Sequence, residues 1–438
     1  MVAINELSDD LLLKILSFLP TKVAVSTSLL PKQWKFFWML WPKLEYDDLE
    51  LSASSALSCL DFIDKNLPLH RAPVIETLLL RFRHTNLLEH EKIKLWVGIA
   101  VSRFVRELSI SYFCFIRKRP DVLSLPRSLY TCNSLMTLKL QGWNILVDVP
   151  PLVCLPSLKT LQLRFVTYSD EDSLRLLLSS CPVLEDLLIE RSNQNDNLIE
   201  IVVNVPSLQR LNLRIGRNCS SHGYSIVTPC LKHFEIEDCR DFPSFMIEPM
   251  PVLEEADIDV RIDIEKILEL ITSVRRLSLH SSFMNAKESV YLAGIVFNQL
   301  EHLKLSIDKT DWSELLFRLL RKSPKLRVLN LSVERDSKVT KDQTAKRKNK
   351  GSSIPECLLT SSIPECLLRS LETLEFSGYT GAEEEIHFLR FLDRHARCLK
   401  TNSQTLVSKY LNEVRIINGF SLDKRFSDFD DAEWFFDH

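Results

Sequence analysis

The sequence predicts an α/β fold: a leucine-rich repeat solenoid, shaped as an imperfect horseshoe, with a short all-helical module at its N-terminus. Three observations predict it. A spaced apolar motif recurs along most of the 438 residues, helical stretches lie between its copies, and residues 6–41 carry an apolar stripe at helical spacing. Hydrophobic residues make up 45% of the chain, which is ordinary for a protein with a packed core.

The repeated motif is an apolar residue, two variable residues, an apolar residue, one variable residue and a third apolar residue. Its last two apolar positions alternate with polar ones, which is the pattern of a short strand with one buried face. One strand cannot bury that face alone, so successive copies are expected to stack around a shared core. Copies begin 21 to 30 residues apart, except the last, which follows after 45. The twelve copies begin at Ile75, Val105, Leu135, Leu158, Leu184, Leu208, Leu231, Leu253, Val274, Leu300, Leu326 and Leu371.

Helical segments are expected between the strands, at Glu171–Leu178 and Trp312–Leu320, because leucines recur there at helical spacing. Proline precedes several strands, as at Pro156 and Pro324, and it cannot continue a helix. These patterns assign the repeats to residues 43–333.

The step of 45 residues marks an insertion. It ends in the basic run Lys346–Lys350, which predicts a mobile surface loop, with a nuclear localisation signal as the alternative. Residues 352–360 then recur as 361–369 with only the last one changed, so only one copy needs to be packed. The acidic and aromatic end of the chain is typical of a disordered tail, with a partner motif as the alternative. The segments after the repeats are therefore assigned as a basic mobile loop at 334–351, a segment completing the array at 352–412 and a disordered tail at 413–438.

The N-terminal module, residues 1–42, has a different pattern. Ser8 is expected to cap a first helix that ends before Pro20, and Thr21 to cap a second helix that reaches about Leu30. Five aromatic side chains then crowd into residues 34–41, and about 35 residues cannot bury so many large groups alone. Some apolar side chains of this module must therefore face either the repeats or another protein. The apolar stripe of the first helix consists of Leu7, Leu11, Ile15 and Leu19.

The chemistry of an enzyme is absent from the sequence. The chain contains no P-loop, GxSxG or HExxH string, which argues against a catalytic or metal site and against a cofactor. A net charge of −3 argues against nucleic acid, and no apolar run approaches the ~18 residues that a membrane span needs. Eleven cysteines without a CxxC pair, behind an N-terminus without a signal peptide, predict reduced and mostly buried thiols in the cytoplasm or nucleus.

A cluster of charged residues is expected on the concave face of the repeats. The residues that flank the last two apolar positions should point there, and in the copies beginning at Leu231 and Leu253 five of them are acidic. Like charges on neighbouring strands destabilise a sheet. We therefore hypothesise that this band receives a basic segment of a partner protein, the alternative being an ordinary solvated face. The candidate binding residues are Arg210, Arg214, Glu235, Glu237, Glu255, Asp257, Asp259 and Arg276.

Both ends of the chain resemble one known family. The string ELSDDLLLKILSFLPTK from Glu6, followed by STS from Ser26 and KQWK from Lys32, is similar to a plant F-box. The string IPECLLRSLETLE from Ile363, with GAEEE and ARCLKT further on, resembles the FBD segment that follows leucine-rich repeats in the same plant family. The order F-box, repeats and FBD covers most of the chain.

The resemblance implies a non-catalytic substrate receptor of an SCF-type E3 ubiquitin ligase. In that family the F-box docks on a Skp-family adaptor, which links it to cullin and RING subunits, while the repeats hold a client protein for ubiquitination. Ser8 stands where the family has proline, and Pro31 stands where a helical serine is usual, so Pro31 should end the second helix early. A sensor of a hormone or inositol phosphate, and a repeat scaffold without ligase coupling, are the alternatives. The implied adaptor-binding residues are Leu7, Ser8, Leu11, Ile15, Leu16, Leu19 and Trp34.

Overall fold

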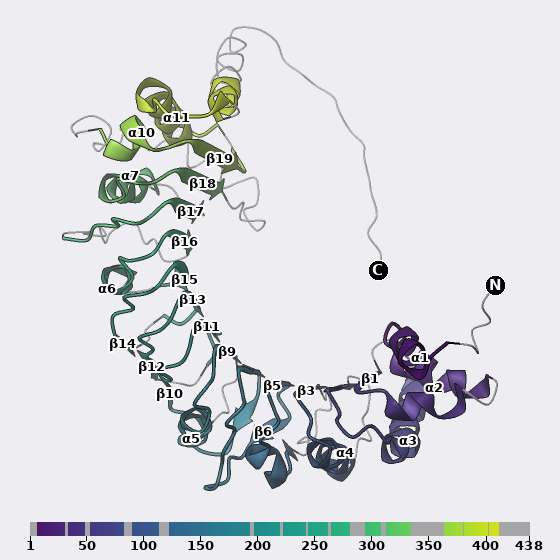
Figure 1. Cartoon of the computed structure of the whole chain (residues 1–438). Helices are drawn as coiled ribbons and strands as arrows, with labels where there is room; N and C mark the ends of the chain where they lie inside the picture. The colour runs from purple at the N-terminus through teal and green to yellow at the C-terminus, as the bar shows by residue number, and fades with distance from the viewer. Residues whose placement is uncertain are drawn as a thin grey trace, which may run out of the picture. The chain divides into compact units, whose positions relative to one another are not determined.

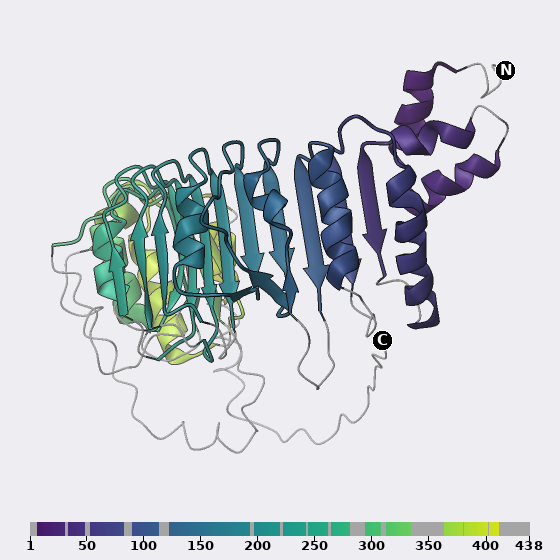
Figure 2. The ribbon, with the colours of Figure 1, turned by 90° about the horizontal axis from the view of Figure 1, so that it is seen from below.

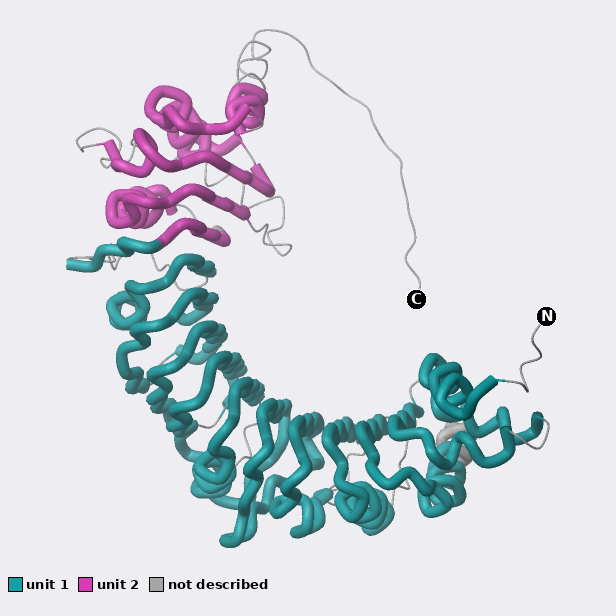
Figure 3. The backbone as a smooth tube through the Cα atoms, viewed as in Figure 1, with its two compact units in different colours: residues 1–285, 293–299 teal, residues 286–292, 300–438 magenta. Residues whose placement is uncertain are grey.

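The computed structural model divides into two compact units (Figure 3). Unit 1 comprises residues 1–285 and 293–299, and unit 2 comprises residues 286–292 and 300–438. The structure describes residues 7–30, 34–48, 53–82, 90–113, 122–192, 197–219, 222–241, 244–261, 264–280, 294–307, 312–333, 363–379, 381–401 and 403–410.

Unit 1 begins with four short helical elements. Asp9 and Asp10 stand in the first turn of α1, where their negative charges interact favourably with the positive end of the helix dipole. Leu12 and Leu16 of the same helix are fully buried. The second helix is shorter than the sequence predicts, because it tightens into a 3-10 turn and Leu30 is extended. Pro31 itself lies outside the described residues, but an extended Leu30 is what a following proline favours. The elements are α1 (Asp9–Leu16), α2 (Thr21–Ser26), η2 (Thr27–Leu29) and η3 (Trp34–Leu40).

The two predicted caps of these helices are wrong. Ser8 occupies the position before α1, but its side chain makes no capping hydrogen bond. Thr21 is the first residue of α2, and its hydroxyl oxygen accepts a hydrogen bond of 2.8 Å from the backbone N–H of Glu45. That hydroxyl instead ties the helices to strand β1 (Lys43–Asp47), a contact that local sequence patterns do not report.

The centre of unit 1 is a parallel sheet in which each motif copy from Ile75 to Val274 forms one strand (Figure 1). Side chains alternate between buried and open faces, and equivalent positions pair, as in Leu211 with Phe234 and Phe234 with Ala256. The apolar motif residues are the core. In spatial order the strands are β1, β2 (Thr77–Phe82), β3 (Glu107–Tyr112), β5 (Thr137–Gln141), β7 (Thr160–Arg164), β9 (Asp186–Arg191), β11 (Arg210–Ile215), β13 (His233–Asp238), β15 (Glu255–Val260) and β16 (Arg276–His280).

Strand β1 was not predicted. Its residues Leu44 and Tyr46 are buried and pair with Leu78 and Leu80 of β2. Trp41, Leu44 and Tyr46 have the spacing of the repeated motif. Two of these three positions hold aromatic residues, unlike the copies found from the sequence. A search for that spacing with aromatic residues allowed would have found a thirteenth copy.

Helices and two small parallel sheets line one face of this sheet, and the strands of unit 1 run in a common direction (Figures 1 and 2). The helix expected at Glu171–Leu178 is confirmed as α5 (Ser173–Ser179). The other face, which we call the open face, is polar. The lining helices are α3 (Ala53–Asn66), η4 (Leu67–Leu69), α4 (His90–Ser102), η5 (Arg127–Thr131), α5 and α6 (Ile264–Leu270). The small sheets are β4 (Leu123–Ser124), β6 (Ile145–Val147) and β8 (Thr167–Tyr168), and β10 (Glu200–Asn204), β12 (Gly223–Val227) and β14 (Ser244–Ile247).

The ion pair between Asp238 and Arg240 in unit 1 is buried. Asp238 stands in a core row of the sheet, between Ile215 and Val260 on the neighbouring strands, and its side chain is 0% exposed. Arg240 donates to both its carboxylate oxygens, from Nε at 2.9 Å and Nη2 at 2.8 Å, and lies over the ring of Tyr224. Burial opposes the charge of Arg240, but the hydrogen bonds and charge of Asp238 outweigh it and raise the pKa of Arg240 above its ordinary value.

Unit 2 continues the same design with the last three motif copies. The second copy of the nine-residue unit supplies α10, whose Cys366 and Leu367 are buried, whereas the first copy lies outside the described residues. The predicted insertion loop and the tail also lie outside them. The elements are β17 (His302–Ile307), α7 (Trp312–Lys322), β18 (Val328–Val333), α10 (Glu365–Arg369), β19 (Thr373–Ser377) and α11 (Glu383–His395).

A short helix at residues 403–410 packs along the edge of β19 that does not pair with β18. The hydroxyl of Ser403 accepts a hydrogen bond from the N–H of Leu374 at 3.0 Å and donates one to its carbonyl oxygen at 3.4 Å. The hydroxyl of Tyr410 donates to the carbonyl oxygen of Phe376, and the N–H of Lys400 donates to that of Glu372. Side chains and backbone thus satisfy a strand edge that would otherwise lie open.

Buried His70 makes the stability of unit 1 depend on pH. Its Nε2 donates to the carbonyl oxygen of Trp41, while Nδ1 has no partner among the described residues. Burial, helped by the charge of Arg103, lowers the pKa of His70 below its ordinary 6.5 despite the bond to Trp41. The unfolded chain therefore takes up a proton near pH 6.5 that the folded chain resists, and stability is lost as the pH falls below that value, by up to about 1.4 kcal/mol per pH unit.

We expect the unfolding midpoint to fall between pH 7.5 and pH 5.5 less steeply in His70→Gln than in the unchanged chain. The matched control is His222→Gln, because His222 is exposed. Thermal unfolding followed by circular dichroism measures all three proteins at both pH values. An identical pH dependence in His70→Gln and the unchanged chain would contradict the prediction.

The cysteines are less buried than predicted. Nine are described as free thiols, of which four are buried, so the expectation that most thiols are buried is wrong for the described cysteines. Cys154, Cys230 and Cys398 are exposed and lie between helices and strands, so the thiols are not confined to the core. None of the helices in the described part of the chain has the length and hydropathy to cross a membrane.

Candidate functional site

The N-terminal helices expose many large apolar side chains. Phe18 is 79% exposed and Leu29 is 89% exposed, although the rest of the module is packed on Leu12, Leu16 and Trp34. Exposed apolar groups gathered on one small module make it a candidate surface for another protein. We call this set the N-terminal apolar surface: Leu11, Ile15, Phe18, Val23, Leu29, Leu30, Phe36 and Leu40.

The predicted adaptor-binding residues divide between this surface and the core. Leu11, Ile15 and Ser8 are exposed, and Leu7 and Leu19 are half-buried. Leu16 and Trp34 are buried, so they hold the helices together and do not face a partner in this conformation. Sequence reasoning missed the exposed groups of α2 and the 3-10 elements, because spacing over so few residues does not separate an inner from an outer face.

The open face of β13 and β15 carries the predicted acidic band, which we define as Glu235, Glu237, Glu255, Asp257 and Asp259. The two strands pair in register, so Glu235 lies opposite Asp257 and Glu237 opposite Asp259. All five side chains stand at half-buried positions of the outward row. Adjacent strands lie about 4.8 Å apart, so the like charges must be balanced from outside the pair of strands.

Arginines on the neighbouring strands supply part of that balance. Arg214 of β11 lies 2.6 Å from Glu235 and 4.0 Å from Glu237, and Arg276 of β16 lies 3.0 Å from Glu255. His280 lies 3.1 Å from Asp257. Arg210 belongs to another pair, with Asp186 of β9. The structure therefore places seven of the eight predicted residues side by side on the neighbouring strands β11, β13, β15 and β16, and Arg210 borders this network of charged residues.

A hollow of about 560 Å³ opens on this network. Its floor spans β7 to β15 and mixes carboxylates, amides and cations, so it can bind polar and charged side chains of a partner. The lining residues include Gln162, Asp186, Leu188, Arg210, Asn212, His233, Glu235, Glu255 and Asp257.

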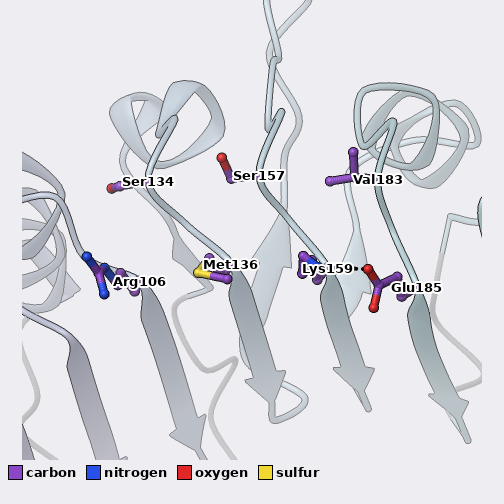
Figure 4. Close-up of a pocket in the computed structure, with 7 residues that line it drawn as sticks. All are labelled: Arg106, Ser134, Met136, Ser157, Lys159, Val183 and Glu185. Carbon is purple, nitrogen blue, oxygen red and sulfur yellow. Dashed lines mark hydrogen bonds and ion pairs between the residues drawn. The ribbon is translucent and has the colours of Figure 1, made fainter.

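A second hollow of about 540 Å³ lies where β3, β5, β7 and β9 begin (Figure 4). One residue before each strand contributes to it: Arg106, Met136, Lys159 and Glu185. Lys159 pairs with Glu185 at 2.8 Å, so part of its charge is used within the chain. The described residues contain no group of ligands that could hold a metal ion.

Two family profiles match parts of the chain. The leucine-rich repeats of the family described as "FBD-associated F-box protein At5g56370" match residues 93–258, within unit 1. The FBD profile matches residues 360–402, which include α10, β19 and α11.

Similar proteins from Arabidopsis thaliana match nearly the whole chain. An FBD-associated F-box protein, At5g60610, is 52% identical over 401 residues, which are 91% of this chain and 98% of that protein. The putative FBD-associated F-box protein At5g56700 is 55% identical over 405 residues, with 92% and 97% covered. The FBD-associated F-box protein At4g10400 is 40% identical over 426 residues, 97% of each chain.

Proposed function

Because the chain belongs to the family of FBD-associated F-box proteins with leucine-rich repeats, we propose that it is the substrate-recognition subunit of an SCF-type E3 ubiquitin ligase. In this role the N-terminal helices dock on a Skp-type adaptor, which joins them to cullin and RING subunits. The repeats hold the client protein. The protein itself is a non-catalytic receptor that acts in the cytoplasm, the nucleus or both.

The N-terminal apolar surface is the observation that carries the proposal. Its side chains come from α1, α2, η2 and η3, and burying their exposed apolar area in an interface is worth about 25 cal/mol per Å². The packed residues beneath, such as Leu12 and Trp34, keep the helices in place without a partner. A surface of this kind suits a stable protein interface rather than a small molecule.

Client capture is assigned to the open face of unit 1. Parallel stacking presents a mostly polar outward row of side chains, and the acidic band with its arginines gives this row a pattern of charge. Charge patterns of this kind select partners and set the rate of encounter more than they add affinity. Adaptor and client therefore use different surfaces, which can be tested independently.

Replacing Leu11 and Leu29 together by aspartate should weaken adaptor binding at least about 30-fold, since each lost anchor costs about 1 kcal/mol or more. Both side chains are exposed, so the variant should fold. The measurement is titration calorimetry of the full chain with a purified plant Skp-type adaptor, with thermal unfolding as the check on folding.

The matched control replaces Leu95 and Leu152 by aspartate, because both are also exposed but lie outside the module. It should bind the adaptor as the unchanged chain does. Equal affinity of the Leu11→Asp/Leu29→Asp variant and the unchanged chain would refute the docking surface, and no adaptor binding by the unchanged chain would refute the ligase role.

A further inference from the structure

Three aromatic side chains lie at the carboxyl ends of β3, β5 and β7. The ring of Trp143 stands edge-on to Phe113 at 5.5 Å between centroids and contacts Phe165 at 6.2 Å. Phe113 is the next outward position after β3, and Trp143 lies exposed in the turn that follows β5, so these rings lie at the edge of the open face. Trp143 is 43% exposed, which is unusual for the largest apolar side chain. We call Phe113, Trp143 and Phe165 the aromatic ladder.

The backbone around the ladder is specialised. Gly142 has φ of +141°, and a side chain there would collide with the carbonyl oxygen of Tyr112, so only glycine fits. The Thr167 hydroxyl donates to the carbonyl oxygen of Trp143 at 3.1 Å. Phe165 has φ of +57°, a conformation that bulky residues rarely adopt. The chain thus accepts strain where it positions the rings, as proteins do at functional sites.

We propose that the aromatic ladder and the acidic band bind one extended segment of the client, with an apolar or aromatic anchor on the ladder and a lysine or arginine on the band. This inference rests on the proposed client-binding role and names the chemistry of the client. The ladder offers ring faces and edges to the anchor, and such aromatic contacts dominate the energy of many interfaces.

Charge decides which side chain each part accepts. The acidic band holds five carboxylates, and the described ion pairs join Arg214 to Glu235 and Glu237 and Arg276 to Glu255, so the carboxylates of the band outnumber these two arginines. That excess favours a cation. The ladder instead adjoins the pair Arg164 and Glu190, 3.7 Å apart, whose charges cancel. An uncharged anchor therefore suits the ladder better than a second cation.

Strand spacing sets the distance between the two parts. From Trp143 beside β5 to Glu237 on β13 there are four steps in the sheet, or roughly 19 Å at about 4.8 Å per step. Glu237 is the second-last residue of its strand, so it also lies toward the carboxyl ends. An extended chain advances about 3.3 Å per residue. The anchor and the cation of the client should therefore be about six residues apart.

The test is selection from a phage-displayed library of random 12-residue peptides on the full-length chain, without adaptor. We expect enriched peptides to carry an aromatic or large aliphatic residue and, about six positions away, lysine or arginine. A synthetic peptide of the enriched sequence should bind at least about tenfold more weakly to Trp143→Ala, and as weakly to Glu237→Lys/Asp257→Lys. Leu152→Ala, which changes another exposed apolar side chain, should bind normally.

Each outcome decides the inference. Enrichment without this pair of residues, no enrichment, or equal binding to all variants would overturn it, while the adaptor titration stays unaffected. The charge reversal changes half-buried side chains of the outward row and no core residue, so it serves if Trp143→Ala fails to fold. An adaptor that does not bind, together with a peptide that does, would refute the ligase role and keep the client site.

Discussion

Replacing Asp238 by alanine should destabilise unit 1 by about 3–5 kcal/mol, because it leaves the buried guanidinium of Arg240 without its counter-charge. Asp238 accepts three hydrogen bonds from Arg240, one of them from the backbone N–H at 3.1 Å. The side chains are 0% and 7% exposed, so water cannot replace the lost contacts. Denaturant unfolding followed by circular dichroism, with hydrogen exchange of β13 amides, measures the loss.

Two variants make this result specific. Asp241→Ala breaks the neighbouring but exposed pair with Arg261, 3.2 Å apart, and should cost no more than about 1 kcal/mol. Asp238→Val combined with Arg240→Met replaces the pair by apolar groups and should recover most of the stability, since Ile215 and Val260 occupy the same core row. A double variant as unstable as Asp238→Ala would show that the charge pair is not the cause.

Replacing Ser403 by alanine should cost unit 2 about 1–3 kcal/mol, because one hydroxyl serves both backbone groups of Leu374. Ser403 is buried, so water does not take over its bonds. The exposed edge of β19 should then favour association between chains. Unfolding, light scattering and hydrogen exchange of the Leu374 amide measure the three consequences.

The control is Thr405→Val on the same helical turn. Thr405 is exposed and its hydroxyl donates to the carbonyl oxygen of Thr401 at 2.8 Å, so its loss should be within about 0.5 kcal/mol. Ser403→Ala with unchanged exchange at Leu374 would mean that the edge is protected by other contacts.

The repeating part of the fold could be predicted from the sequence because its signal is local. Leu211 and Leu213 alternate with Asn212 and Arg214, the equivalent apolar positions recur in each copy, and the strands appear where this spacing does. The small sheets escaped prediction, since strands as short as Thr167–Tyr168 have no period to detect. Thr21 was assigned a local cap, but its hydroxyl bonds Glu45, 24 residues away.

The sequence predicted which strands carry the candidate site, but it did not predict which charged side chains pair with each other. Adjacent copies put Glu235 beside Asp257, and the register confirms it. Which cation meets which acid depends on side-chain reach, so the pairing of Arg214 with Glu235 and of Arg210 with Asp186 could not be deduced. Burial separated Leu16 from Leu11, although both belong to one apolar helix.

The pairing of β18 with β19 has a consequence for how this gene can change. These strands stay in register, with Leu329 opposite Leu374, although 39 residues separate Val333 from Thr373. Doubling such a connection costs only about 0.6 kcal/mol of closure entropy. Insertions and duplications in this connection therefore leave the pairing of β18 with β19 unchanged, which explains how the nine-residue duplication could be tolerated. The same junction would accept an epitope or a fluorescent tag while the neighbouring repeats stay paired.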